Sequence, residues 1–109
     1  MRDRVSLWID MATANDPNPN LQQAAGSNEA AEIIDVKGGQ VVRGRTIEAN
    51  INALVTVRAS TRTLALTSKD EVRGTSIPYL GVRFKIAAVA VKRSNGRPVW
   101  VELDCTRVT

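Results

Sequence analysis

The sequence predicts a small all-β protein, an antiparallel β-barrel or sandwich with long loops and room for one short helix. Three observations lead to this fold class. A strong hairpin signal lies at Asn95-Gly96, two other segments alternate apolar and polar residues, and turn-forming residues separate the short apolar runs. Several short strands separated by turns are typical of barrels and sandwiches.

The hairpin is predicted over residues 79–108. Asn-Gly favours a type I′ turn, because both central residues of that turn need a positive φ. Counting outward from the turn predicts three pairs on one apolar face: Ala90 with Val101, Ala88 with Leu103, and Ile86 with Cys105. Phe84 extends this face at the far end. A two-stranded ribbon is not stable alone in water, so the rest of the chain is expected to cover the apolar face.

Further strands are expected at residues 2–11, 30–37 and 51–59. In the first of these, alternation places Trp8 on the outward face. Two interpretations of Trp8 stay open: it packs against a neighbouring loop, or it anchors an interface, where tryptophan is enriched. In the third, Ile51 is expected on the same face as Ala53 and Val55, with Leu54 on the other.

The connections are less regular. Residues 12–29 predict a long loop, because the prolines at 17 and 19 lack an N–H and restrict the residue before each of them. This loop is either a mobile surface segment or a contact to a neighbouring copy. Residues 38–50, which contain glycines, predict an arm or loop, with a turn, an extended arm or a short helix near 46–50 all open. Residues 60–75 predict a connection with a turn near 67–71.

Length and composition limit the class of protein. The 109 residues predict a single domain, 1–109, with a net charge of +4 that permits but does not require an acidic partner. One cysteine and no histidine exclude an internal disulfide and argue against structural zinc. No apolar run approaches 18 residues and no signal-peptide pattern opens the chain, so a soluble, intracellular protein without a membrane partner is expected.

Catalytic signals are nearly absent. Without histidine the commonest general base is missing, and histidine-dependent triads cannot form within the chain. Cys105 falls on the apolar face of the hairpin, which predicts a buried structural thiol. The glycines at 38, 39 and 44 lack the Lys-Ser/Thr ending of a phosphate-binding loop. We therefore predict a protein that is not an enzyme and has no cofactor, metal or catalytic residue.

Basic and aromatic residues supply the candidate contact sites. Arg43 and Arg45 are candidates for contact with DNA phosphates or with a neighbouring chain, since such contact needs charge but no base readout. Trp8 and Trp100 are the candidate interface residues. Glu102 and Asp104 follow Trp100 on the same face, which favours a solvated or protein-facing surface over a base-stacking platform.

Five segments, taken in chain order, resemble one known family. They are RDRVSL at the start, EIIDVKGGQVVRGRTIEA, LVTVR, YLGVRFKIAAV and VELDCT near the end. Together they resemble the strands and the glycine-containing segment of the phage head–tail joining family, also called head-closure or stopper proteins. The resemblance spans most of the chain, and it implies a small antiparallel β-barrel.

The resemblance also implies a function. It implies a virion structural protein, assembled in the host cytoplasm, that forms a homo-oligomeric ring at the neck of a phage or phage-like particle. Such a ring closes the DNA-filled head below the portal and adaptor, docks the tail protein, and lets double-stranded DNA pass through its channel. Residues 12–29 and 38–50 would contact a neighbour or line the channel. The alternatives are a small β-barrel nucleic-acid-binding module and a tail-terminator or minor tail protein.

Overall fold

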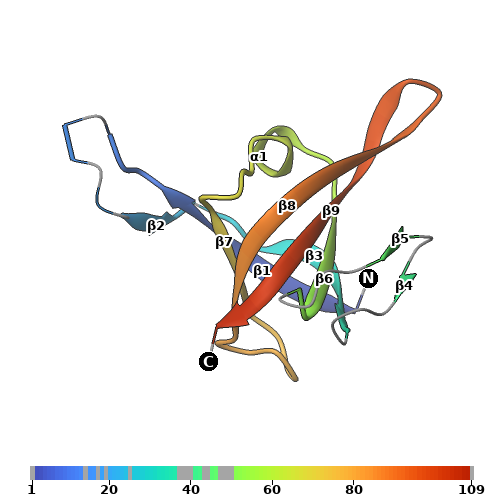
Figure 1. Cartoon of the computed structure of the whole chain (residues 1–109), viewed down its shortest axis with the longest axis horizontal. Helices are drawn as coiled ribbons and strands as arrows, with labels where there is room; N and C mark the ends of the chain where they lie inside the picture. Colours follow the sequence, from blue (N-terminus) through green and yellow to red (C-terminus); the bar gives the residue numbers. More distant parts are fainter. Residues whose placement is uncertain are drawn as a thin grey trace.

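The computed structural model of the protein has the predicted all-β antiparallel architecture (Figure 1). It describes residues 2–13, 15, 16, 18, 20–24, 26–36, 41, 42, 45, 46 and 51–108, and at 41, 42, 45 and 46 it describes the backbone only. A single sheet closes on itself into a six-stranded barrel, which confirms the predicted fold class.

The barrel is formed by six antiparallel strands. In their spatial order they are β1 (Asp3–Asp10), β3 (Glu29–Asp35), β6 (Ala53–Arg58), β9 (Arg97–Val108), β8 (Arg83–Ser94) and β7 (Glu71–Gly74). The ring closes where β1 pairs with β7, with Val5 opposite Gly74 and Leu7 opposite Val72. Closure pairs the edges that an open sheet of this size would expose.

Two ribbons project from the barrel, on opposite sides of the molecule in Figure 1. On one side, β2 (Leu21–Gln23) pairs with the end of β1, with Ile9 opposite Gln22. We call the described residues of 9–24 the arm. On the other side, β8 and β9 continue beyond the barrel to their turn, and we call residues 92–99 the hairpin tip. A separate two-stranded ribbon consists of β4 (Val41–Val42) and β5 (Arg45–Thr46).

The core fills the interior of the barrel. Phe84 is its largest fully buried side chain, and aliphatic residues and Cys105 supply the rest. The cluster comprises Val5, Leu7, Ala31, Ile33, Ala53, Val55, Val57, Leu66, Val72, Phe84, Ile86, Val101, Leu103 and Cys105. A second, small cluster lies on the outer face of β6, where Leu54 packs with Val36 and Ile51. The predicted placement of Ile51 on the same face as Ala53 is therefore wrong, because Ile51 precedes the strand and folds over Leu54.

The hairpin turn forms as predicted, but part of the predicted register is wrong. Asn95 and Gly96 have φ values of 52° and 79°, as a type I′ turn requires. The pairs observed are Val91 with Val101, Ala90 with Glu102, Val89 with Leu103, Ala88 with Asp104, and Ile86 with Cys105. One irregularity at Lys92/Arg93 shifts the register, and a second at Ile86/Ala88 restores it. Only the Ile86–Cys105 pair was predicted correctly, and Val89 rather than Ala88 packs on the core.

Two other segments differ from the prediction. The connection at 60–75 contains α1 (Thr61–Leu64) and the barrel strand β7, and the loop at 12–29 contains β2. Strand β7 was not predicted because it is only Glu-Val-Arg-Gly, in which ion pairs bury the charged Glu71 and leave Arg73 half-buried. The short helix lies at 61–64, whereas residues 47–50, where one was left open, are outside the described residues.

Candidate functional site

Of the two arginines predicted as contact residues, the structure describes only one, and only its backbone. Arg43 lies outside the described residues. Arg45 lies in β5, where its backbone pairs with Val42. Their contact with DNA or a neighbour therefore stays a prediction.

Trp8 lies half-buried on the outer surface of the barrel, where β1 meets β7. The Arg73 guanidinium carbon lies 3.6 Å from the centre of the Trp8 ring, which is a close cation–π contact. The indole N–H donates to the Ser6 hydroxyl at 3.0 Å. Trp8 thus packs against an arginine of the neighbouring strand β7, and its role as an interface anchor stays a prediction.

Glu71 holds this arginine in place. Glu71 is only 2% exposed, and its carboxylate accepts from Arg83 Nε at 2.7 Å and Arg73 Nη2 at 3.0 Å. A buried carboxylate is tolerated when it is both paired and hydrogen-bonded. Because Glu71, Arg73 and Arg83 lie on β7 and β8 next to Trp8 on β1, this cluster fastens the barrel where it closes.

A cavity of about 330 Å³, lined mostly by charged residues together with Leu21 and Val108, lies beside the cluster at the root of the arm. Asp70 lines it and accepts from the backbone N–H of Asp10 at 2.9 Å and of Thr67 at 2.8 Å. The Asp10 carboxylate accepts from the N–H groups of Ala12 and Asn20, and these hydrogen bonds lower the pKa of Asp10. Asp70 therefore holds the arm to the barrel, and Asp10 joins the two sides of the arm; the lowered pKa of Asp10 does not suit a general acid at neutral pH.

Trp100 lines a groove of about 470 Å³ below the hairpin tip. The Arg58 guanidinium lies 5.7 Å from the centre of its ring, and the two residues are opposite each other on β6 and β9. Ala59, Pro98 and Val99 provide an apolar wall, and Arg97 adds a second cation. The groove thus combines an aromatic ring, an apolar wall and two guanidinium groups.

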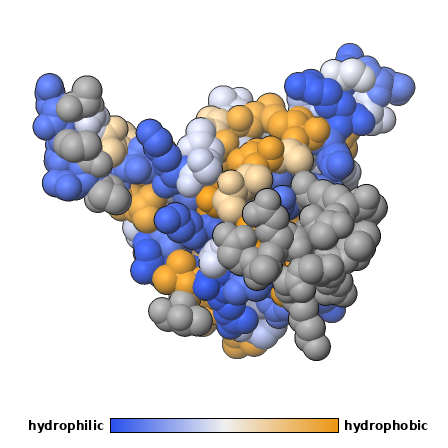
Figure 2. All heavy atoms as spheres, in the orientation of Figure 1, coloured by the Kyte–Doolittle hydropathy of each residue, from blue (hydrophilic) through white to orange (hydrophobic). Residues whose placement is uncertain are grey.

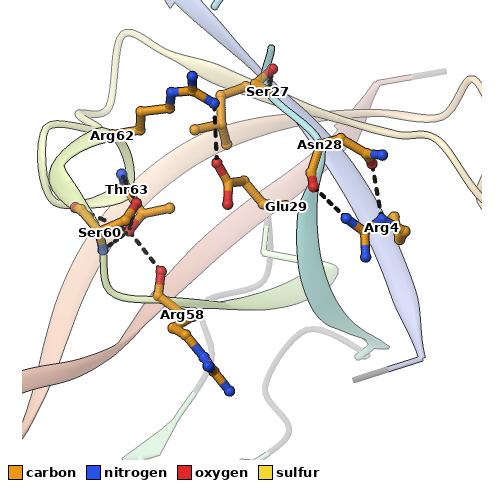
Figure 3. A network of polar contacts seen from close by, with 9 residues as sticks. Arg4, Ser27, Asn28, Glu29, Arg58, Ser60, Arg62 and Thr63 are labelled. Carbon is orange, nitrogen blue, oxygen red and sulfur yellow. Dashed lines mark hydrogen bonds and ion pairs between the residues drawn. The ribbon is translucent and has the colours of Figure 1, made fainter.

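Helix α1 fixes the end of β6 that forms this groove (Figure 3). The fully buried Thr63 donates its hydroxyl to the Arg58 carbonyl at 2.8 Å, and the same oxygen accepts from the Ser60 N–H at 2.8 Å. The Ala59 N–H donates to the Val99 carbonyl at 2.9 Å, which attaches this end of β6 to β9. The groove therefore has a rigid floor.

The outer contacts in Figure 3 attach the same region to β1 and β3. Arg62 pairs with Glu29 at 3.8 Å, while Arg4 donates to the side chain and the carbonyl of Asn28 at 3.0 and 2.6 Å. The Arg62 pair is half-exposed, so its contribution to stability is small.

The two projections differ in charge. The hairpin tip carries Lys92, Arg93 and Arg97 and no acidic residue, with Arg58 beside it. From 11 to 24 the sequence has Asp16 and no lysine or arginine. Figure 2 shows hydrophilic surface on both projections and hydrophobic surface between them, over α1 and the upper part of β8. Leu64 of α1 is 41% exposed.

Cys105 is buried as predicted. Its side chain is fully enclosed in the core, and burial raises the pKa of the thiol. The described part of the chain contains no cluster of three or more Cys, Asp or Glu side chains that could hold a metal ion. Nor does it contain a helix long and apolar enough to cross a membrane.

Comparison of the chain with protein-family models, with curated proteins and with solved structures gave no match. The groove below the hairpin tip was missed by the sequence analysis, although Trp100 was identified. The signal that could have found it is Pro98, because a proline within a strand marks an edge or a bulge. The irregularity next to Pro98 leaves Val99 without a counterpart on β8 and shapes the groove wall.

Proposed function

We propose that this protein is a structural subunit that joins copies of itself into a ring at the neck of a phage or phage-like particle. The ring would close the DNA-filled head, lie between the portal or adaptor protein and the tail protein, and let double-stranded DNA pass. The observation that carries this proposal is a closed barrel with two unlike ribbons projecting from opposite sides (Figure 1).

Unlike projections favour a head-to-tail contact. When one surface of a subunit meets a different surface of the next, the contact is heterologous, and it builds a ring when the rotation between neighbours closes. A surface of one kind meeting itself would give a two-fold dimer instead. The arm and the hairpin tip differ in charge and in shape, as a heterologous contact requires.

Open backbone edges on both projections support assembly. Among the described strands, β2 pairs only with β1, so its other edge has no strand partner there. Strand β8 pairs with β7 only over Arg83–Lys85, so from residue 87 onward β9 is its only strand neighbour in the described sheet. Such edges are templates for pairing with another chain.

The loop between β7 and β8 is a candidate surface for another ring of the neck. Ile77 and Leu80 are 83% and 64% exposed in this loop, which lies at the far end of the barrel from α1 (Figure 1). Large exposed apolar side chains that lie close together favour a protein partner. We assign this surface to the portal, adaptor or tail protein.

An image of the particle neck tests the proposal. Cryo-electron microscopy of purified particles is expected to show a ring of these barrels between the portal or adaptor and the tail. Particles assembled without the protein should lose DNA or fail to accept tails. A neck that lacks the barrel, or particles that package and join normally without it, would contradict the proposal.

A small nucleic-acid-binding module is the second candidate, because Trp100 lies beside the cations of the hairpin tip. It predicts that the isolated protein binds single-stranded or duplex DNA, with log K falling linearly as log salt concentration rises. The ring subunit predicts weak binding to free DNA. Fluorescence anisotropy with labelled oligonucleotides over a range of salt concentrations separates the two.

A further inference from the structure

The geometry points to the contact that builds the ring: we infer that the arm of one copy seats in the groove below the hairpin tip of the next copy. This inference rests on the proposed function and specifies its interface. The occupant is a second copy of this chain. The elements that meet are the arm around Asp16 and Gln22 and the groove beside Trp100 and Arg97.

Charge is the first argument for this occupant. From 11 to 24 the sequence has one acid, Asp16, and no cation, and the Asp16 side chain is exposed. The hairpin tip has Lys92, Arg93 and Arg97 and no acid, with Arg58 on the groove wall. Opposite potentials on two surfaces steer them together and suppress the contact of either surface with itself.

Chemical complementarity is the second argument. The arm presents Met11, which is 52% exposed, and the exposed amide side chains of Gln22 and Gln23 beside the open edge of β2. The groove offers the half-buried Pro98, Val99 and Trp100, with guanidinium groups at its rim. An apolar centre surrounded by polar and charged groups is the usual anatomy of a protein interface.

Placement is the third argument. The arm and the hairpin tip extend to opposite sides of the barrel in Figure 1, so the arm of a chain does not occupy its own groove. A neighbour placed beside the hairpin presents its arm toward that groove. Repeating this step uses every arm and every groove once, and the assembly is a ring when the rotation between neighbours closes.

Cross-linking between different chains tests the contact. One preparation carries Gln22→Cys and another Ser94→Cys, and they are mixed with a short bis-maleimide. Both positions are exposed, and Ser94 lines the groove, while the native Cys105 is buried. We expect covalent dimers in the mixture and not from either preparation alone. The matched control, Leu80→Cys with Ser94→Cys, should give none, because Leu80 lies in the β7–β8 loop.

Charge reversal provides a second, independent measurement. Asp16→Lys and Arg97→Glu are each expected to weaken self-association by about three- to tenfold, by analogy with other interface charge pairs. The double variant should recover most of the loss, because the reversed charges again attract across the contact. Both sites are exposed, and circular dichroism confirms that each variant is folded.

The outcomes separate this inference from the proposed function. Rings seen at the neck without any Gln22–Ser94 cross-link would overturn the inference and leave the proposed function standing. Cross-linked chains whose barrel is missing from the neck would overturn the proposed function and leave the contact standing. A protein that stays monomeric at every concentration and gives no cross-link would contradict both.

Discussion

Tyr79 attaches the β7–β8 loop to the barrel, and its titration can be measured. It is the only tyrosine of the chain, and its hydroxyl donates to Asp35 Oδ2 at 3.0 Å while its ring contacts Phe84. Burial and then the neighbouring Asp35 raise the pKa of Tyr79 above its ordinary value of 10.0. Because deprotonation is harder in the folded state, the free energy of unfolding should fall as pH rises above about 10.

We expect this titration to be visible as phenolate absorbance against pH. The midpoint in the folded protein should lie above that of the protein unfolded in urea. Asp35→Asn should lower the folded midpoint toward 10.0 without reaching it, since burial is the larger cause. Equal midpoints in folded and unfolded protein would contradict the contact between Tyr79 and Asp35.

Gly74 lies where the chain leaves β7, directly against the following loop. A Cβ atom added there would lie 2.1 Å from the carbonyl oxygen of Tyr79, which is a backbone atom that cannot rotate away. We expect Gly74→Ala to lower the free energy of unfolding by about 1–3 kcal/mol or more, as overpacking does. Urea denaturation followed by tryptophan fluorescence measures the loss.

A second glycine supplies the control for that measurement. Gly96 in the hairpin turn has open space around it but a φ of +79°, so Gly96→Ala adds backbone strain without a clash. Strain of this kind costs about 1–2 kcal/mol. A Gly74→Ala loss no larger than the Gly96→Ala loss would show that the loop yields more easily than the geometry indicates.

Thr63 decides the geometry of α1. Its buried hydroxyl donates to the Arg58 carbonyl and accepts from the Ser60 N–H, so Thr63→Val leaves both backbone groups without this partner. We expect a loss of about 1–3 kcal/mol, the cost of unsatisfied buried polar groups. Thr63→Ser keeps the hydroxyl and serves as the control. Equal melting temperatures for the two variants would contradict this role of the hydroxyl.

The strands differ in how far the sequence could predict them. Alternation identified β1 and β6, and Asn95-Gly96 located the hairpin, because these signals are local. The two irregularities that cancel along β8 and β9 were not predictable by counting from the turn, although Pro98 marked the first. Strand β7 was missed, because the charged residues Glu71 and Arg73 are expected at the surface. The ion pairs that allow Glu71 to be buried form only when the chain folds.

The candidate site, too, was predictable only where the signal is local in the sequence. Trp8 and Trp100 could be named from sequence because large aromatic side chains on an outward face are conspicuous. Their partners, Arg73 and Arg58, come from strands distant in the sequence and become neighbours only when the barrel closes. The groove depends on the irregularity at Val99 and on α1, so only the folded chain shows it.

At the level of the whole molecule, the barrel and its projections have different tasks. Closure through β1 and β7 gives the core a complete cover, whereas the arm and the hairpin tip have few buried contacts within the chain. Segments of this kind open locally at low free-energy cost, and they gain protection when a partner covers them. Assembly should therefore change the projections and leave the barrel as it is.

Hydrogen exchange measured by mass spectrometry tests this division. In dilute protein, peptides covering residues 20–24 and 92–99 should exchange fast, while those of β6 and the barrel part of β9 should be protected. In concentrated, assembled protein, both projections should gain protection together, and Arg97→Glu should reduce the gain in each. Protection gained only in the β7–β8 loop, with the arm and tip unchanged, would place the contact between copies at that loop instead.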